Sequence, residues 1–127
     1  MKIGSSQIGE SSPPFIVAEM SGNHNQSLER ALKIIDMASE VGADAIKIQT
    51  YTADTITLES DRDDFLIKDK SSLWNGENLH SLYQKAHTPW DWHEKIFDYS
   101  KKKGILCFSS PFDESAIEFL EKFNPPA

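Results

Sequence analysis

The stretch SLERALKIIDMASEVGADAIKIQTY, residues 27–51, decides the fold because it joins a helix pattern directly to a strand pattern. Ser27 can cap a helix whose apolar positions recur three or four residues apart, at Leu28, Ala31, Leu32, Ile35, Ala38 and Val41. Gly42 is typical of the position just beyond a helix. Residues 43–51, with isoleucine at 46 and 48, then predict a strand.

The same unit recurs on both sides of this stretch. Upstream, FIVAEM at residues 15–20 is a short apolar run between prolines and Ser21-Gly22-Asn23, which predicts a buried strand. Downstream, Thr88 is expected to cap a helix that has Pro89 in its first turn and ends at Gly104. A third strand at 105–110 follows, and then a third helix that begins at Asp113 or Pro111; residues 79–86 predict a short extra helix.

Three strand-then-helix units predict an α/β protein with a parallel sheet. Such units fit either an open doubly wound sheet or part of a (β/α)8 TIM barrel, and the pattern alone does not choose. A complete barrel needs roughly 250 residues, so this chain would supply less than half of one. Residues 1–14 are expected to form a short β-hairpin or extension ahead of the barrel part at 15–127.

Composition excludes some classes of function. The chain has 20 Asp and Glu against 13 Lys and Arg, a net charge of -7, so nucleic acid is not expected as a partner. No apolar run approaches the roughly 20 residues of a membrane span, and the N-terminus has no signal-peptide core. With one cysteine and no disulfide, a cytoplasmic location fits best. Cys107 lies in an apolar run, which favours a buried residue over a nucleophile.

Polar residues gather where each predicted strand ends. Glu19 closes the first strand, Lys47 and Gln49 share one face of the second, and Ser110 closes the third. This edge of a parallel sheet is where ligands bind. A buried Lys47 needs an anion, which is either a ligand or Glu19 in a structural ion pair. Glu19 is correspondingly either a general acid or base or a solvated carboxylate.

Metal ligation is not indicated by the histidines. His24 stands between two asparagines, and the other three histidines show no ligand spacing; these are His80, His87 and His93. No metal ligand is therefore assigned within the chain.

Three motifs in register resemble the sialic acid synthase family (N-acetylneuraminate synthase-like). Residues 15–28 (FIVAEMSGNHNQSL), 42–50 (GADAIKIQT) and 108–114 (FSSPFDE) are similar to its first three strands with their loops. Met20-Ser21-Gly22, Ser71–Gly76 and Thr88–His93 resemble the pseudaminic acid branch of the family.

The resemblance implies a (β/α)8 barrel followed by a small antifreeze-like domain in a homodimer. It implies a synthase that condenses phosphoenolpyruvate with an N-acetylated amino sugar to give a nine-carbon 2-keto acid and phosphate. A divalent metal, Mn²⁺ or Mg²⁺, would activate the aldehyde from histidines on later strands, outside this chain. The 127 residues alone are therefore expected to be an inactive N-terminal part.

By match to the family motifs, Lys47 and Ser110 would bind phosphoenolpyruvate and Glu19 would be the catalytic carboxylate. Gln49 would line the sugar site, and Asn23 and His24 would shape the loop over it.

Other functions stay open. The chain is also consistent with an N-acetylneuraminate or legionaminic acid synthase, or with another phosphoenolpyruvate-using barrel enzyme. An alternative of a different class is a non-catalytic fragment that associates through its open sheet edges.

Overall fold

A three-stranded parallel sheet forms the centre of the computed structural model, which describes all residues from 1 to 127. Its order is β3 (Val17–Glu19), β4 (Ala45–Thr50) and β5 (Leu106–Pro111), and both neighbouring pairs run parallel. The predicted α/β class and the predicted parallel pairing of all three strands are confirmed.

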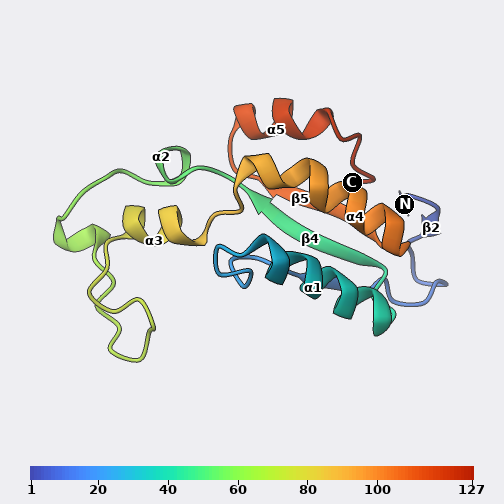
Figure 1. The fold of residues 1–127 in the computed structure, drawn as a ribbon, viewed down its shortest axis with the longest axis horizontal. Coiled ribbons are helices and arrows are strands. Elements are labelled where there is room, and N and C mark those ends of the chain that lie inside the picture. Colours follow the sequence, from blue (N-terminus) through green and yellow to red (C-terminus); the bar gives the residue numbers. More distant parts are fainter.

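Helices α1 (Leu28–Glu40), α4 (His93–Lys103) and α5 (Glu114–Glu121) pack against the sheet (Figure 1). The core lies between them and the strands and includes Ile35, Ile46, Ile48, Ile96 and Cys107, all at most 5% exposed. Ile46 and Ile48 face the helices, as their alternation with Lys47 and Gln49 predicts. No helix has the length and apolar character needed to cross a membrane.

Four of the helix boundaries have clear physical causes. The Ser27 hydroxyl accepts the Arg30 backbone N–H at 3.2 Å and caps α1. The Asp113 carboxylate accepts the Ala116 N–H at 3.1 Å and caps α5. Gly42 and Gly104 follow α1 and α4 with φ of 81° and 74°, a left-handed conformation that glycine adopts without steric cost.

The predicted start of α4 is wrong. Residues Trp90–Trp92 form a 3₁₀ turn, and the α-helix begins only at His93. The turn has no side-chain cap, because Thr88 is 1% exposed and its hydroxyl lies 3.3 Å from His24 Nε2 instead. A tertiary contact has therefore taken the residue that local pattern assigned to capping.

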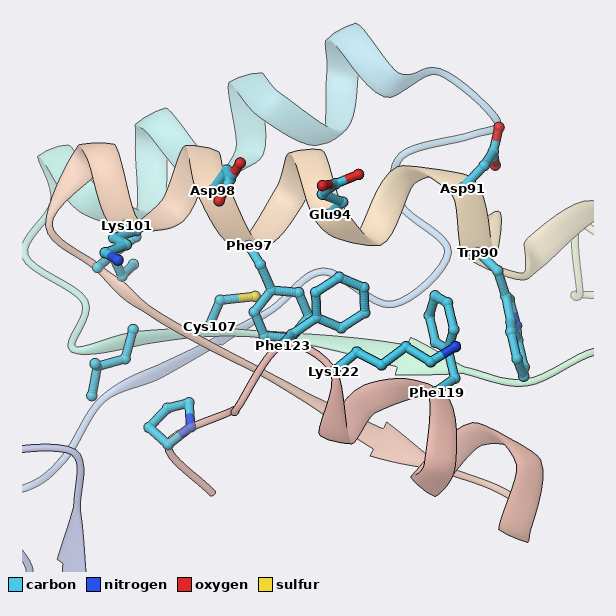
Figure 2. A pocket seen from close by; sticks show the side chains of 13 residues that line it. Trp90, Asp91, Glu94, Phe97, Asp98, Lys101, Cys107, Phe119, Lys122 and Phe123 are labelled. Atoms are coloured by element: carbon cyan, nitrogen blue, oxygen red, sulfur yellow. The ribbon is translucent and has the colours of Figure 1, made fainter.

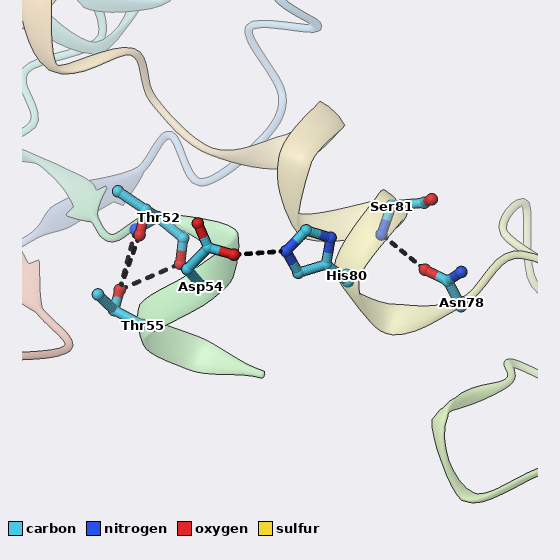
Figure 3. Close-up of polar contacts among 6 residues, drawn as sticks. All are labelled: Thr52, Asp54, Thr55, Asn78, His80 and Ser81. Atoms are coloured by element: carbon cyan, nitrogen blue, oxygen red, sulfur yellow. Dashed lines mark hydrogen bonds and ion pairs between the residues drawn. The ribbon is translucent and has the colours of Figure 1, made fainter. Parts of the chain in front are cut away.

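Residues 52–87, between β4 and α4, form an excursion that reaches away from the sheet (Figure 1). It holds α2 (Ala53–Ile56), a 3₁₀ turn at Asp63–Phe65 and α3 (Leu79–Ala86), the last as predicted. Figure 3 shows Asp54 of α2 facing His80 of α3, with 2.8 Å between Oδ1 and Nε2. Polar contacts therefore join the two helices of the excursion.

An antiparallel hairpin precedes the sheet. Its strands are β1 (Lys2–Ile3) and β2 (Ser6–Gln7), and Gly4 between them has φ of 56°. A Cβ at Gly4 would lie 3.1 Å from Leu106 Cδ1, so the hairpin packs at the beginning of β5.

Candidate active site

Four polar side chains from three strands share the sheet face that lies opposite the helices. The parallel register aligns Glu19 with Lys47 and Gln49 with Ser110. Residues paired in this way point to the same face, and Lys47 and Gln49 are two apart on one strand. The structure therefore brings Glu19, Lys47, Gln49 and Ser110 together near the carboxyl ends of the strands.

Glu19 and Lys47 form an ion pair, with 2.7 Å between Oε2 and Nζ. Their side chains are 40% and 32% exposed, so solvent reaches both. A pair this accessible contributes no more than about 1 kcal/mol to stability. It is the contact expected if Lys47 has a structural partner, yet it leaves both groups open to a ligand, because an incoming anion can compete with Glu19 for the ammonium.

Gln49 is oriented by the loop that follows β3. The Ser21 hydroxyl donates to Gln49 Oε1 at 3.1 Å, which leaves the amide N–H₂ group free to donate elsewhere. Ser21 was not among the predicted site residues. Its position directly after the strand predicted at 15–20 was the available signal, but its contact with β4 depends on the loop conformation.

The loop from Ser21 to Ser27 has an unusual backbone. Ser21, Asn25 and Gln26 all have φ near +50°, a region that few non-glycine residues adopt. Gln26 Nε2 donates to the carbonyls of Lys85 and His87, at 2.9 and 2.7 Å, and thereby ties the loop to the end of the excursion. Asn23 Nδ2 donates to Met20 O at 2.9 Å. Side-chain contacts therefore maintain the strained turns.

His24 lies beneath this loop and is fully buried. Its Nδ1 accepts the Gln26 backbone N–H at 3.2 Å, so Nε2 carries the proton of the neutral ring and faces Thr88 Oγ1. The ring packs edge-on against Trp92, with 5.5 Å between centroids. Burial, and secondarily the charge of His87, lower the pKa of His24 and keep it neutral. Its predicted role in shaping the loop stays a prediction.

Aromatic rings connect the excursion to the end of the sheet. Tyr51 packs edge-on against Tyr83 of α3 and Phe112 after β5, with centroids 5.7 and 5.3 Å apart. Burial raises the pKa of Tyr51 to about 12. Trp90 Nε1 donates to Tyr51 O at 3.2 Å. These contacts, which the sequence did not predict, place the excursion beside the carboxyl ends of the strands.

A second polar group lies on the opposite face, beneath the same strand ends. Thr50 Oγ1 is 2.8 Å from His93 Nε2 and 2.6 Å from Ser109 Oγ. All three side chains are buried. No local pattern predicts this place for His93, because its partners lie 43 positions earlier and 16 later in the chain.

A hollow of about 740 Å³ lies between α4, α5 and β5 (Figure 2). Its lining combines aromatic rings with charged side chains; Trp90, Phe97, Phe119 and Phe123 supply the rings. None of the four polar residues Glu19, Lys47, Gln49 and Ser110 lines it. Cys107, in its wall, is 5% exposed, and burial raises the pKa of its thiol to about 12. The prediction of a buried rather than nucleophilic cysteine is confirmed.

The candidate residues do not by themselves fit a metal ion. No group of three or more His, Cys, Asp or Glu side chains converges in the structure. Lys47 already pairs with Glu19, and both ring nitrogens of His24 have partners. Divalent ions need several ligands, and these residues alone do not supply them.

The NeuB family model matches residues 34–127. The chain belongs to the NeuB family. It is 56% identical over 113 residues to a pseudaminic acid synthase of Campylobacter jejuni, a match that covers 89% of this chain and 32% of that protein. A pseudaminic acid synthase of Helicobacter pylori is 48% identical over 114 residues, covering 90% of this chain and 33% of that protein.

A solved structure gives the corresponding likeness of fold. N-acetylneuraminic acid (sialic acid) synthetase from Leptospira borgpetersenii superposes with a TM-score of 0.78 at 27% identity, over 98% of this chain and 38% of that one. The predicted family resemblance is thus confirmed. The chain spans about a third of the length of the curated relatives it matches.

Proposed function

We propose that the protein to which this chain belongs is a phosphoenolpyruvate-dependent nonulosonic acid synthase that makes pseudaminic acid. The reaction would join the three carbons of phosphoenolpyruvate to the aldehyde carbon of an N-acetylated amino sugar, consume one water and release phosphate. The cluster of Glu19, Lys47, Gln49 and Ser110 on one sheet face carries the proposal. The 48–56% identity to pseudaminic acid synthases supports the product, against 27% for the sialic acid synthetase structure.

Lys47 and Ser110 would bind the anionic groups of phosphoenolpyruvate. Lysine supplies the positive charge, and a serine hydroxyl at a strand end can donate a hydrogen bond to a phosphate or carboxylate oxygen. The two residues lie on adjacent strands and face the same side, with Phe108 opposite Lys47 and Ser110 two residues further along. We expect one anion to contact both once Lys47 turns away from Glu19.

Glu19 would act on protons during the condensation. In the free protein its carboxylate is engaged by the Lys47 ammonium at 2.7 Å. A bound anion that draws Lys47 toward itself would free a Glu19 oxygen to accept or return a proton. The ion pair would then serve as the resting state of the site.

Gln49 would contact the sugar through its free amide N–H₂ group, since Ser21 already occupies its oxygen. Asn23 and His24 would set the shape of the loop beside it. This loop is attached to the excursion through Gln26, so the excursion would form one wall of the sugar site.

The wider architecture is part of the same proposal. Both outer strands, β3 and β5, have an unpaired edge, and further strands added there would continue the sheet into a (β/α)8 barrel. We propose that a divalent cation, Mn²⁺ or Mg²⁺, assists the reaction from ligands outside residues 1–127, and that residues 1–127 alone are inactive. A cytoplasmic homodimer is proposed as the working form.

The test is an assay of a protein of the relatives' length that contains this chain. It would be incubated with phosphoenolpyruvate, Mn²⁺ and a panel of N-acetylated amino sugars. We expect phosphate release coupled to a nine-carbon 2-keto acid, identified by mass spectrometry. Absence of that product with every sugar, from a folded protein, would contradict the proposal. A sialic or legionaminic acid as the sole product would correct the substrate and keep the reaction class.

A further inference from the structure

A continuous chain of buried hydrogen bonds crosses from β5 through β4 to the start of α4. Ser109 Oγ lies 2.6 Å from Thr50 Oγ1, and Thr50 Oγ1 lies 2.8 Å from His93 Nε2. On its other side, His93 Nδ1 is 3.2 Å from Pro89 O. Thr50, His93 and Ser109 are 0%, 0% and 9% exposed, so water does not take the place of these partners.

The protons available allow this chain two directions. A neutral imidazole carries one proton, and each hydroxyl carries one. Pro89 O and Ile48 O can only accept, and Ile48 O lies 3.2 Å from Ser109 Oγ. With the imidazole proton on Nδ1, His93 donates to Pro89 O, Nε2 accepts from Thr50, and Thr50 accepts from Ser109. With the proton on Nε2, His93 donates to Thr50, Thr50 donates to Ser109, and Ser109 donates to Ile48 O. Either direction joins His93 to both strands.

The surroundings of His93 favour the neutral ring. The groups that pack on it from α5 are Phe119 and Phe123, with Lys122 beyond the Phe119 ring, and those from β4 and β5 are Thr50 and Ser109. The nearby carboxylate is Asp91, on the same turn. Burial outweighs Asp91 and the backbone carbonyls of Pro89 and Trp90, and the pKa of His93 is lowered.

The chain ends next to the proposed binding residues. Thr50 follows Gln49 on β4, and Ser109 precedes Ser110 on β5, with the side chains of each pair on opposite faces. We propose that His93 is a positioning residue, which through Thr50 and Ser109 holds the ends of β4 and β5 in register and thereby aims Gln49 and Ser110 at substrate. This inference rests on the proposed function for the roles of Gln49 and Ser110, whereas the positioning itself is a property of the fold.

Two substitutions of Thr50 distinguish a role in positioning Gln49 and Ser110 from a role in stability alone. Thr50→Val keeps the shape of the side chain and removes the hydroxyl, which breaks the chain at its centre. Thr50→Ser keeps the hydroxyl and should restore the wild-type behaviour. Ser39→Ala is the matched control, because Ser39 also joins two elements, α1 and the end of α4, through a hydrogen bond to Lys103 O at 3.0 Å.

The first measurement needs no substrate and uses nuclear magnetic resonance on the protein of the relatives' length, with selectively labelled residues. We expect the ¹⁵N shifts of the His93 ring to change in Thr50→Val, because Nε2 loses its hydroxyl partner. Thr50→Val should move the amide signals of Gln49 and Ser110, and Thr50→Ser and Ser39→Ala should leave them in place. Unmoved Gln49 and Ser110 amide signals in Thr50→Val, or unmoved His93 ring signals, would overturn the inference.

The second measurement is kinetic and uses the protein of the relatives' length. Thr50→Val should raise the KM for phosphoenolpyruvate and sugar or lower kcat by up to roughly a hundredfold, the effect of a misplacement near 1 Å. Thr50→Ser should recover most of the loss, and Ser39→Ala should lower Tm without changing KM. A Thr50→Val protein with lower Tm but wild-type kcat and KM would make the chain purely structural. If the wild type itself is inactive, the proposed function fails, and the resonance shifts alone decide the positioning.

Discussion

The sheet with its helices and the excursion at residues 52–87 are built by different means. Of the 21 buried residues, only Ala53 and His80 lie in the excursion. The sheet part buries apolar side chains at regular intervals, whereas the excursion exposes Leu58 at 70% and Leu73 at 98%. The difference teaches that the excursion depends on the sheet for its position, because it has too little buried apolar area to hold a conformation by itself.

What holds the excursion is a small number of specific contacts. Tyr83 packs on Tyr51, the Lys85 and His87 carbonyls accept from Gln26, and Asp54 pairs with His80 (Figure 3). The Asp54 side chain is 88% exposed, so this pair contributes no more than about 1 kcal/mol. Substitutions in the sheet part should accordingly have larger effects on activity and stability than substitutions in the excursion.

The largest expected difference between the two regions is in kcat, when one carboxylate in each region is replaced by its amide. Glu19→Gln keeps the shape of the side chain and removes its charge and proton transfer, so kcat should fall by about 10²–10⁴. The matched change in the excursion, Asp54→Asn, should leave kcat within a few-fold. Steady-state kinetics on the protein of the relatives' length check both. A Glu19→Gln enzyme with unchanged kcat would remove Glu19 from the mechanism.

Core packing gives the next largest effect. Ile46 is 0% exposed between the sheet and α1, so Ile46→Ala should cost about 2–5 kcal/mol of unfolding free energy. Leu73→Ala in the excursion should change it by less than about 0.5 kcal/mol, because Leu73 has almost no buried contact to lose. Urea unfolding followed by circular dichroism measures both. Equal losses of unfolding free energy in the two variants would mean that Leu73 packs in the core as Ile46 does.

Two ion pairs of similar length allow a third comparison. Lys47→Met removes the cation that would bind phosphoenolpyruvate. The KM for phosphoenolpyruvate should rise by a factor that corresponds to about 1.5–3 kcal/mol of lost binding free energy. Lys85→Met in the excursion removes the partner of Glu77, at 2.6 Å, and should leave that KM unchanged. A Lys47→Met protein that loses affinity for both substrates equally, or fails to fold, would favour the structural alternative for Lys47.

Acid should weaken the sheet part through its two buried histidines. Burial lowers the pKa of both His24 and His93 below the ordinary value of 6.5. As the pH falls, the histidines of the unfolded chain bind protons before those of the folded protein. The stability that neutral rings provide is therefore fully present above about pH 6.5, and it decreases as the pH falls toward the lowered pKa values of the folded protein. Each histidine contributes at most about 1.4 kcal/mol per pH unit to the slope.

Unfolding free energies measured between about pH 8 and pH 5 test this slope. His93→Gln should flatten part of it, because glutamine does not titrate. A slope that is unchanged by His93→Gln would show that the ring does not titrate differently on unfolding.

Local pattern predicted the elements whose burial repeats with their own period. The alternation in Ala45–Thr50 assigned Lys47 and Gln49 to one face and Ile46 and Ile48 to the other, and the register confirmed it. Ser27 and Asp113 marked helix starts correctly, since a cap contacts residues only three positions away. The same logic failed at Thr88, where a partner 64 positions earlier was preferred to a local cap.

The sequence by itself determined the three strand-then-helix units, the polar strand ends and the family, because these depend on spacing over a few residues and on short motifs. Only the tertiary structure decided that Lys47 pairs with Glu19, that Ser21 orients Gln49 and that Ser109, Thr50 and His93 form one buried chain. These contacts join residues 28, 28, 43 and 59 positions apart. No periodicity connects such distant residues, since only the packing of separate elements brings their polar groups within hydrogen-bonding distance.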